Sequence, residues 1–309
     1  MQRKVSRIGP STLMVSLPSE WCKKFQIKKG DDLNIGIEDD KLLISKKEIY
    51  INRGIYELKI STEDPEVFKM LVLAPLLLAP YMKGYSTIKV SFESDAVLNY
   101  IRKAVTQFLL GFEIIEQGKK HCIIKNIARG IEEEFSIIFH RVFRQTVNMG
   151  KTISEAIKKK DFTLLERIEA EESFTDKLNY FCRRMLHVQH PAQSQNISHI
   201  YRIICIIEEI GDCYKYMAFH LIKYKRIPSA KLVIYLDDAN KFVELTHQWL
   251  QKFDEEKYFK ERPRYTFFYS QDIYPTIPQE DSALLGYLIM IVHRLIHITD
   301  EELTKEPLF

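Results

Sequence analysis

Several features of secreted, membrane-spanning and nucleotide-binding proteins are missing from this sequence. Its 309 residues contain five cysteines, an odd number with no C-x-x-C pair, which favours a reduced, cytoplasmic protein with buried thiols. Residues 1–7 are polar and basic, so we expect no secretory signal there. The most apolar runs, 70–82 and 284–298, are shorter than the ~20 residues that span a bilayer, and we expect no membrane insertion.

Net charge is also small. The formal charge is +3 at pH 7, too little for the whole chain to indicate nucleic-acid binding. An apolar fraction of 46% and a charged fraction of 28% are typical of a globular protein, and the length suits two or three domains. Neither G-x-G-x-x-G nor a P-loop occurs, so the common nucleotide-binding motifs are excluded.

Residues 1–48 have the pattern of a small β-β-α-β-β unit. Alternating apolar residues predict strands at 2–8, 13–17, 33–37 and 42–45, and Pro18 begins a short helix. A unit of this size buries too little surface to be stable alone. We therefore expect it to complete its core against a second copy, as a homodimer through residues 1–48.

Basic residues are concentrated in the first half of this unit. Before Asp31, Glu20 is the single acid among seven cationic residues: Arg3, Lys4, Arg7, Lys23, Lys24, Lys28 and Lys29. Such a surface favours contacts with DNA phosphates, and arginine can read base edges. On charge alone, a solvated face of a small β-unit is an equal alternative.

Several motifs in this unit resemble the AbrB/MazE/SpoVT family. They are Arg3-Lys4-Val5, Gly9-Pro10-Ser11, Val15-Ser16-Leu17-Pro18, Ile27-Lys28-Lys29-Gly30-Asp31 and Leu42-Leu43-Ile44-Ser45. The resemblance implies a swapped-hairpin β-barrel built by an intertwined dimer, with Arg3, Lys4 and Arg7 on DNA. The glycine-serine loop 9–12 lacks the further basic residue that the family usually carries there.

Residues 49–128 predict an α+β layer with the order β-α-β-α-β-β. Strands are expected at 55–60, 87–92, 112–116 and 122–127, with helices from Asp64 towards Tyr81 and from Ser94 to Leu110. Pro75 and Pro80 should kink or end the first helix, and Gly111 should be the C-cap of the second. No catalytic constellation is evident, so we expect a connecting or ligand-sensing role.

Residues 129–309 show helical periodicity and predict an antiparallel bundle. Helices are expected at 131–160, 161–188, 197–226, 228–253 and 279–302, with residues 262–278 irregular. The whole chain is thus expected to be a multidomain α+β protein whose C-terminal half is helical.

The clearest functional signal is a pair of carboxylates on each of two consecutive helices. Glu172 and Asp176 share one helical face, and so do Glu208 and Asp212. Like charges at this spacing destabilise a helix, so we expect a cation to compensate them. Antiparallel packing would bring both pairs together as oxygen ligands for magnesium, calcium, manganese or iron, with zinc possible. Two solvated acidic faces are the alternative.

The residues around these carboxylates resemble archaeal PhoU-type phosphate uptake regulators. The segment 172–186 is similar to their second-helix pattern, and Glu208-Glu209-Ile210-Gly211-Asp212 to their third-helix motif, with Glu209 at an arginine position. The resemblance implies two three-helix repeats, 129–226 and a divergent 227–309. It also implies multinuclear metal on Glu172, Asp176, Glu208 and Asp212, and control of phosphate uptake.

Two further features of the helical half carry predictions. Gly211 lies inside a helix, where glycine costs about 1 kcal/mol relative to alanine, so we expect close packing at that position. His293 and His297 stand where the acidic motif of the second repeat would fall. They could share a metal ion, although packed or surface histidines are the alternative on so apolar a helix.

Together these features predict a non-enzymatic, DNA-binding transcriptional regulator of phosphate homeostasis with a metal-binding helical bundle. The alternative is a regulator that acts through protein contacts, in which the hairpins serve only to dimerise and the bundle binds a phosphate transporter subunit or sensor. A metal-dependent hydrolase is a lesser alternative, because no nucleophile–base pair is evident.

Overall fold

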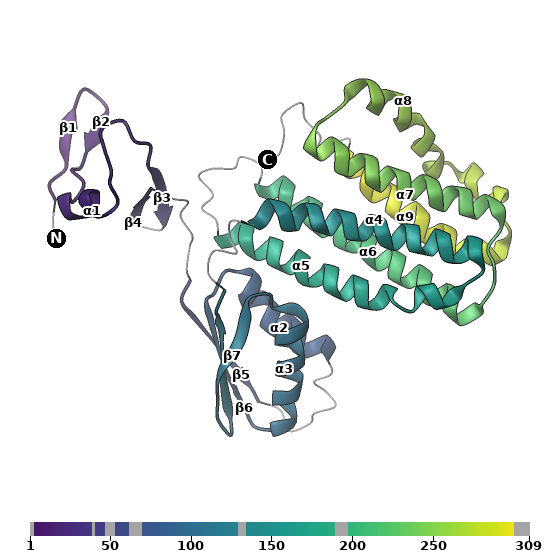
Figure 1. The fold of residues 1–309 in the computed structure, drawn as a ribbon, viewed down its shortest axis with the longest axis horizontal. Helices are drawn as coiled ribbons and strands as arrows, with labels where there is room; N and C mark the ends of the chain where they lie inside the picture. The colour runs from purple at the N-terminus through teal and green to yellow at the C-terminus, as the bar shows by residue number, and fades with distance from the viewer. Residues whose placement is uncertain are drawn as a thin grey trace.

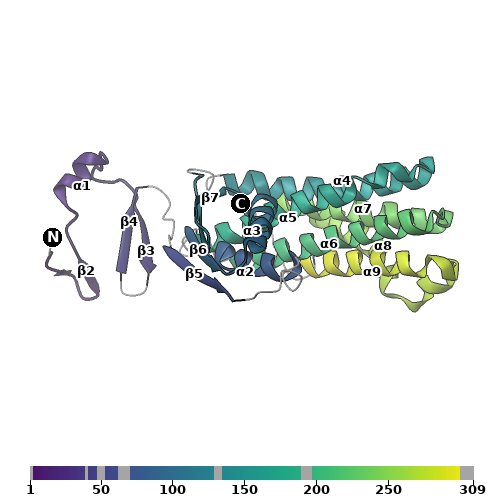
Figure 2. The ribbon, with the colours of Figure 1, turned by 90° about the horizontal axis from the view of Figure 1, so that it is seen from below.

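The computed structural model describes residues 3–38, 41–46, 53–61, 70–128, 134–188 and 197–299. These residues form a small N-terminal unit, an α+β layer and a helical bundle (Figures 1 and 2). Among the described helices, none combines the length and the apolar character that a membrane span requires.

The N-terminal unit consists of two hairpins and one short helix. Strand β1 (Ser6–Ile8) pairs antiparallel with β2 (Thr12–Met14), and β3 (Asn34–Glu38) with β4 (Lys41–Ser45), with α1 (Ser19–Lys24) between them. The β-β-α-β-β order is as predicted. The hairpins form two separate sheets, so the described part of a single chain contains no closed barrel. The predicted barrel is one that two intertwined chains build, so it stays a prediction, with its remaining strand pairs expected from a second copy.

The α+β layer has the predicted order of elements. It contains β5 (Ile55–Ile60), α2 (Met70–Met82), β6 (Thr87–Phe92), α3 (Asp95–Phe108), β7 (Phe112–Gln117) and β8 (His121–Asn126). The sheet order is β5-β6-β8-β7, with β5 and β6 parallel and the other pairs antiparallel. A parallel pair needs a crossover, and α2 lies in it. Both helices cover one face of the sheet and bury Leu77 and Ile101 against Ile88.

The two prolines of α2 correct a prediction, because Pro75 and Pro80 both lie inside the helix. Each proline removes a backbone donor and costs about 3 kcal/mol in a helix interior. The same helix buries Leu73, Leu77 and Tyr81 completely, and each such side chain contributes about 1.5–3 kcal/mol. Burial therefore offsets the local penalty. The predicted helix start at Asp64 lies outside the described residues.

The second helix of the layer also ends differently from the prediction. Ser94 caps α3 by accepting a hydrogen bond from the Ala96 N–H, as expected, but the helix ends at Phe108 with Leu109 as its C-cap. Gly111 instead lies at the turn into β7 with φ +83°, a conformation that favours glycine.

The bundle contains six α-helices in its described part. They are α4 (Phe135–Lys159), α5 (Ile168–Val188), α6 (Ile197–Tyr224), α7 (Ala230–Gln251), α8 (Glu255–Thr266) and α9 (Ser282–His297). Asp161 caps a 3-10 helix, Phe162–Leu165, rather than α5 itself. Residues 262–278 are not irregular as predicted, because α8 continues through Pro263 and is followed by short 3-10 turns.

Helix α5 joins the bundle to the α+β layer, because both α2 and α3 pack against it. The buried Arg184 side chain donates to the Tyr81 carbonyl at 2.7 Å and to the Tyr85 carbonyl at 2.9 Å. Lys177 Nζ donates to the Thr106 carbonyl of α3 at 2.6 Å. Cationic side chains of α5 thus satisfy backbone oxygens at the ends of both layer helices.

Candidate functional site

The predicted carboxylates of α5 and α6 lie together in the seam between the two helices. Lys215 Nζ bridges them, because it donates to Glu172 Oε1 of α5 at 2.5 Å and to Asp212 Oδ1 of its own helix at 2.6 Å. Further along the seam, Arg183 Nη2 donates to Glu208 Oε2 at 3.2 Å. Because the helices run antiparallel, residues early in α5 face residues late in α6.

Burial and mutual repulsion determine the protonation of this carboxylate cluster, which we define as Glu172, Asp176, Glu208 and Asp212. Burial raises the pKa of Asp176 to about 9, and repulsion from Glu172, Glu208 and Asp212 adds to the shift. Burial also raises the pKa of Glu172, although Lys215 opposes the change. At neutral pH Asp176 therefore holds a proton in a chain without bound metal, which lowers the negative charge of the cluster.

The cations beside the cluster are residues that the sequence analysis did not single out. We expected a compensating cation, and Lys215 and Arg183 are in the position to act as one. Burial disfavours a charged Lys215, but hydrogen bonds to Asp212 and Glu172 prevail and raise its pKa. The signal was available: Lys215 is three residues after Asp212, and Arg183 is seven after Asp176, so each shares a helical face with the carboxylates.

One buried polar side chain near the cluster has no protein partner. Asn179 is three residues after Asp176 on α5 and is completely buried, yet neither its amide nitrogen nor its amide oxygen is hydrogen-bonded. An unsatisfied buried amide costs about 1–3 kcal/mol, so such a group normally has a water molecule, ion or ligand beside it. The seam therefore has unused hydrogen-bonding capacity one turn from the carboxylates.

The side chains as they lie do not form a metal coordination shell. Within the described ranges, no three histidine, cysteine, aspartate or glutamate side chains are arranged to hold a metal ion. Lys215 lies between Glu172 and Asp212, where an ion shared by these two residues would have to bind. Metal binding by the four carboxylates therefore stays a prediction, and it requires Lys215 to move aside.

Two other predicted features of the bundle, the histidines of α9 and Gly211 of α6, add no ligand to the cluster. His293 stacks on Tyr269 with ring centroids 3.8 Å apart, a packing contact, while His297 is exposed one turn later on α9. Gly211 does not mark the close packing that we expected. A Cβ atom there would meet only Met149 Cε, at an ordinary 3.5 Å.

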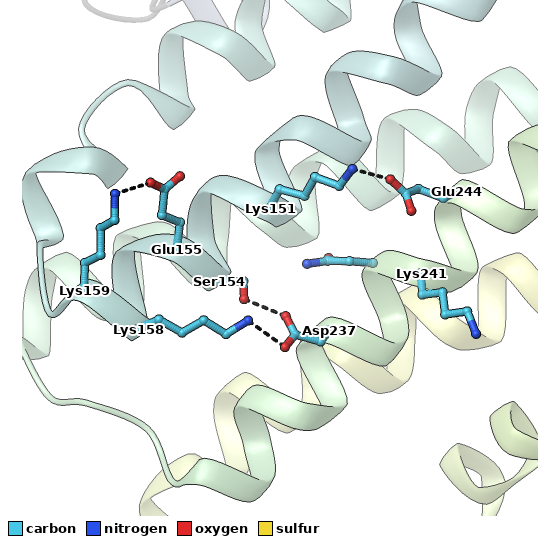
Figure 3. Close-up of a pocket in the computed structure, with 9 residues that line it drawn as sticks. Lys151, Ser154, Glu155, Lys158, Lys159, Asp237, Lys241 and Glu244 are labelled. Carbon is cyan, nitrogen blue, oxygen red and sulfur yellow. Dashed lines mark hydrogen bonds and ion pairs between the residues drawn. The ribbon is translucent and has the colours of Figure 1, made fainter.

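A groove of about 410 Å³ lies between α4 and α7 and has many charged side chains (Figure 3). It is lined by Lys151, Ser154, Glu155, Lys158, Lys159, Asp237, Asn240, Lys241 and Glu244. Each lysine has a carboxylate partner: Lys151 contacts Glu244, Lys158 contacts Asp237, Lys159 contacts Glu155, and Lys241 contacts Glu261. Each lysine of the groove is therefore neutralised by an ion pair, three of them with carboxylates of the lining and Lys241 with Glu261 beside it.

The predicted DNA contacts, Arg3, Lys4 and Arg7, are all exposed in the N-terminal unit. Arg7 lies in β1 opposite Leu13 of β2, and Arg3 and Lys4 precede the strand. Their position on the first hairpin is the one that the sequence resemblance implied, and their contact with DNA stays a prediction.

Comparison with known proteins identifies a relative for one part of the chain. No curated protein and no solved structure matches the sequence. Residues 7–51 match a family model described as "Antidote-toxin recognition MazE, bacterial antitoxin". The match covers the two hairpins and α1, and it does not reach the α+β layer or the bundle. The N-terminal unit is therefore similar to the MazE antitoxin family, which confirms the AbrB/MazE/SpoVT resemblance for this segment.

Proposed function

We propose that this protein is a dimeric, DNA-binding transcriptional regulator of phosphate uptake whose helical bundle binds a metal ion. The proposed dimer is supported by the lack of buried side chains in the described part of the MazE-like unit. Of the side chains described between residues 3 and 46, none is buried, and Val5, Leu13 and Leu42 are each more than 60% exposed. Such a unit needs a second copy to bury these side chains.

DNA binding is supported by the family match and by the charge of the first hairpin. Arg3, Lys4 and Arg7 are exposed, and a two-fold axis would present two such sets on one molecule. Cationic side chains on a paired hairpin suit the phosphate backbone, where each contact releases counterions.

Metal binding is supported by the chemistry of the carboxylate cluster. Among the described residues, the cations paired with these four oxygen-donor side chains are Lys215 and Arg183, so a divalent cation would compensate the charge that appears when Asp176 loses its proton. The unpartnered amide of Asn179, on the same face of α5, could provide a further oxygen. The link to phosphate uptake depends on the PhoU-type motifs that contain these residues.

The first test measures DNA affinity against salt concentration for the dimer and two matched triple variants. Replacing Arg3, Lys4 and Arg7 with alanine should weaken binding and reduce the salt slope by about 0.9 per lost phosphate contact. The control replaces Lys103, Lys119 and Lys120 of the α+β layer, which removes equal charge and should leave the slope unchanged. Equal losses in both variants would contradict a DNA interface on the hairpin.

The second test joins metal content to DNA affinity. Elemental analysis for magnesium, manganese and iron should find one of these ions in the parent protein and not in a Glu172→Gln/Asp212→Asn variant. DNA affinity should then differ between the metal-loaded and metal-free parent, because an effector acts only through differential affinity. Identical DNA affinity in both states would show that the bundle does not control the hairpins.

A second candidate is a regulator that acts only through protein contacts. The matching family is described as one of toxin recognition, which favours a protein partner for the N-terminal unit. In that case the hairpins dimerise and bind protein, and the bundle contacts a transporter subunit or sensor. Absence of salt-dependent DNA binding would favour this candidate.

A further inference from the structure

Two histidines and a glutamine converge at the seam between α4 and α7, away from the carboxylate cluster. His140 Nδ1 of α4 lies 3.0 Å from His247 Nε2 of α7. The side-chain nitrogen of Gln251, one turn after His247, lies 3.2 Å from His247 Nε2 and 3.5 Å from His140 Nδ1. Three potential ligand atoms therefore form a nearly equilateral triangle.

The size of this triangle matches a metal coordination shell. Zinc binds imidazole nitrogen at about 2.0–2.1 Å in tetrahedral geometry, which separates neighbouring ligand atoms by roughly 3.3 Å. The three observed separations, 3.0, 3.2 and 3.5 Å, bracket that value. Amide oxygen and nitrogen differ only by a half-turn of the group, so Gln251 can present its oxygen at the same position.

The aromatic neighbours hold both imidazoles in place. The ring of Phe143 stacks on His247 with centroids 4.9 Å apart and planes 5° from parallel. Phe139 packs edge-on against His140 at 5.7 Å. A ligand set that is fixed before metal arrives loses little conformational entropy on binding, which favours affinity. Gln251 is exposed and leaves the site open to solvent for a water ligand.

We propose that His140, His247 and Gln251 form a binding site for a first-row transition metal ion, with Zn²⁺ as the representative ion. Imidazole nitrogens suit zinc, nickel and copper, whereas the oxygen-only carboxylate cluster suits magnesium, calcium or manganese. The two sites would therefore take ions of different classes. Bound metal would tie the second turn of α4 to the last turn of α7.

The protonation of the two rings agrees with this assignment. Burial lowers the pKa of His247 to about 4, and His140 and Arg144 add to the shift; burial and Arg144 also lower the pKa of His140. Both rings are therefore neutral at pH 7, which is the form that binds metal. One proton lies between the facing nitrogens; on metal binding it transfers to the far nitrogen of the same ring, with no net release.

The test is a Zn²⁺ titration of the full-length protein by calorimetry, with Tm measured in parallel. The parent should bind one Zn²⁺ at this site and gain several degrees in Tm at saturation. His140→Gln and His247→Gln should each weaken binding at least tenfold and abolish most of the Tm gain. His220→Gln on α6, a matched histidine outside the triangle, should behave like the parent, and so should Glu172→Gln/Asp212→Asn.

The proposal would be overturned if the parent bound no Zn²⁺, if the two histidine variants bound it as the parent does, or if binding were lost only in Glu172→Gln/Asp212→Asn. That last result would place the zinc in the carboxylate cluster instead.

Discussion

Gly150 of α4 lies against buried side chains of α6 and α7. A Cβ atom there would lie 2.2 Å from Asn240 Oδ1 and 2.8 Å from the Tyr214 ring. Tyr214 and Asn240 are buried and joined by a 2.6 Å hydrogen bond from the tyrosine hydroxyl to the amide oxygen. Neither group can move away without losing that bond.

Gly150→Ala should therefore lower the free energy of unfolding by about 2–3 kcal/mol, even though alanine is the better helix former. Gly211→Ala is the matched control, because Gly211 is also helical and buried but has only one ordinary contact at 3.5 Å. It should be neutral or stabilise by up to about 1 kcal/mol. Urea denaturation measures both, and equal effects of the two substitutions would refute the packing explanation.

These two glycines show what the sequence could predict at the residue scale. The pattern around Gly211 indicated a helix and a carboxylate pair, and both are present. It did not indicate which glycine was packed, because that depends on Tyr214 and Asn240, which lie 64 and more residues after Gly150 in the sequence. Periodicity identifies the face of a helix, whereas the side chains opposite that face depend on the three-dimensional packing.

Asp281 ties together three elements of the bundle. It precedes α9, accepts a hydrogen bond from the backbone N–H of Ser229 at the start of α7, and pairs with Arg226 just after α6. Its side chain is completely buried. Burial alone would raise its pKa, but the hydrogen bonds from Ser229 and the charge of Arg226 prevail, and the pKa is lowered.

A lowered carboxylate pKa stabilises the fold above the pKa of the unfolded chain and ceases to do so as pH falls through the folded-state pKa. The contribution of Asp281 to the free energy of unfolding should therefore be constant near neutral pH and decline below about pH 4. Asp281→Asn should lower the free energy of unfolding by about 1–3 kcal/mol at pH 7. It should also make the loss of stability between pH 5 and pH 3 smaller than in the parent. Chemical denaturation at pH 7, 5 and 3 tests this, with the exposed neighbour Glu280→Gln as the control.

At the scale of elements, prediction worked where a pattern was strong and local. The order of strands and helices along the chain in the α+β layer, and the long helices α4 to α7, agree with the periodic pattern of apolar residues. Prediction was wrong at Pro75 and Pro80, where burial of the surrounding leucines outweighs a local rule. It was also wrong for residues 262–278, where prolines indicated an irregular segment but occupy α8 and 3-10 turns.

The whole molecule should be a dimer, because none of the side chains described in the N-terminal unit is buried. Light scattering after size-exclusion chromatography should give twice the chain mass of 36.5 kDa. Leu13→Glu and Ile35→Glu place a charge on apolar side chains that are 67% and 56% exposed in one chain, and each should raise the dimer dissociation constant about 100-fold or more.

The matched control for this test is Ile137→Glu on α4, a similarly exposed apolar residue outside the N-terminal unit. It should leave the dimer intact. A monomeric parent, or dimers that persist in both N-terminal variants, would contradict assembly through the hairpins. The sequence predicted the need for a partner from unit size alone. It could not show that the two hairpins form separate sheets within one chain, because the pattern of apolar residues does not determine which strands pair.

Helix α5 has two occupied faces, and this limits how the molecule can change shape. One face carries Glu172 and Arg183 against α6, and the other anchors the α+β layer through Lys177 and Arg184. An α-helix is stiff along its length, so the contacts on its two faces move together. Any rotation of α5 about its axis that accommodates an ion in the carboxylate cluster would therefore move the α+β layer with it.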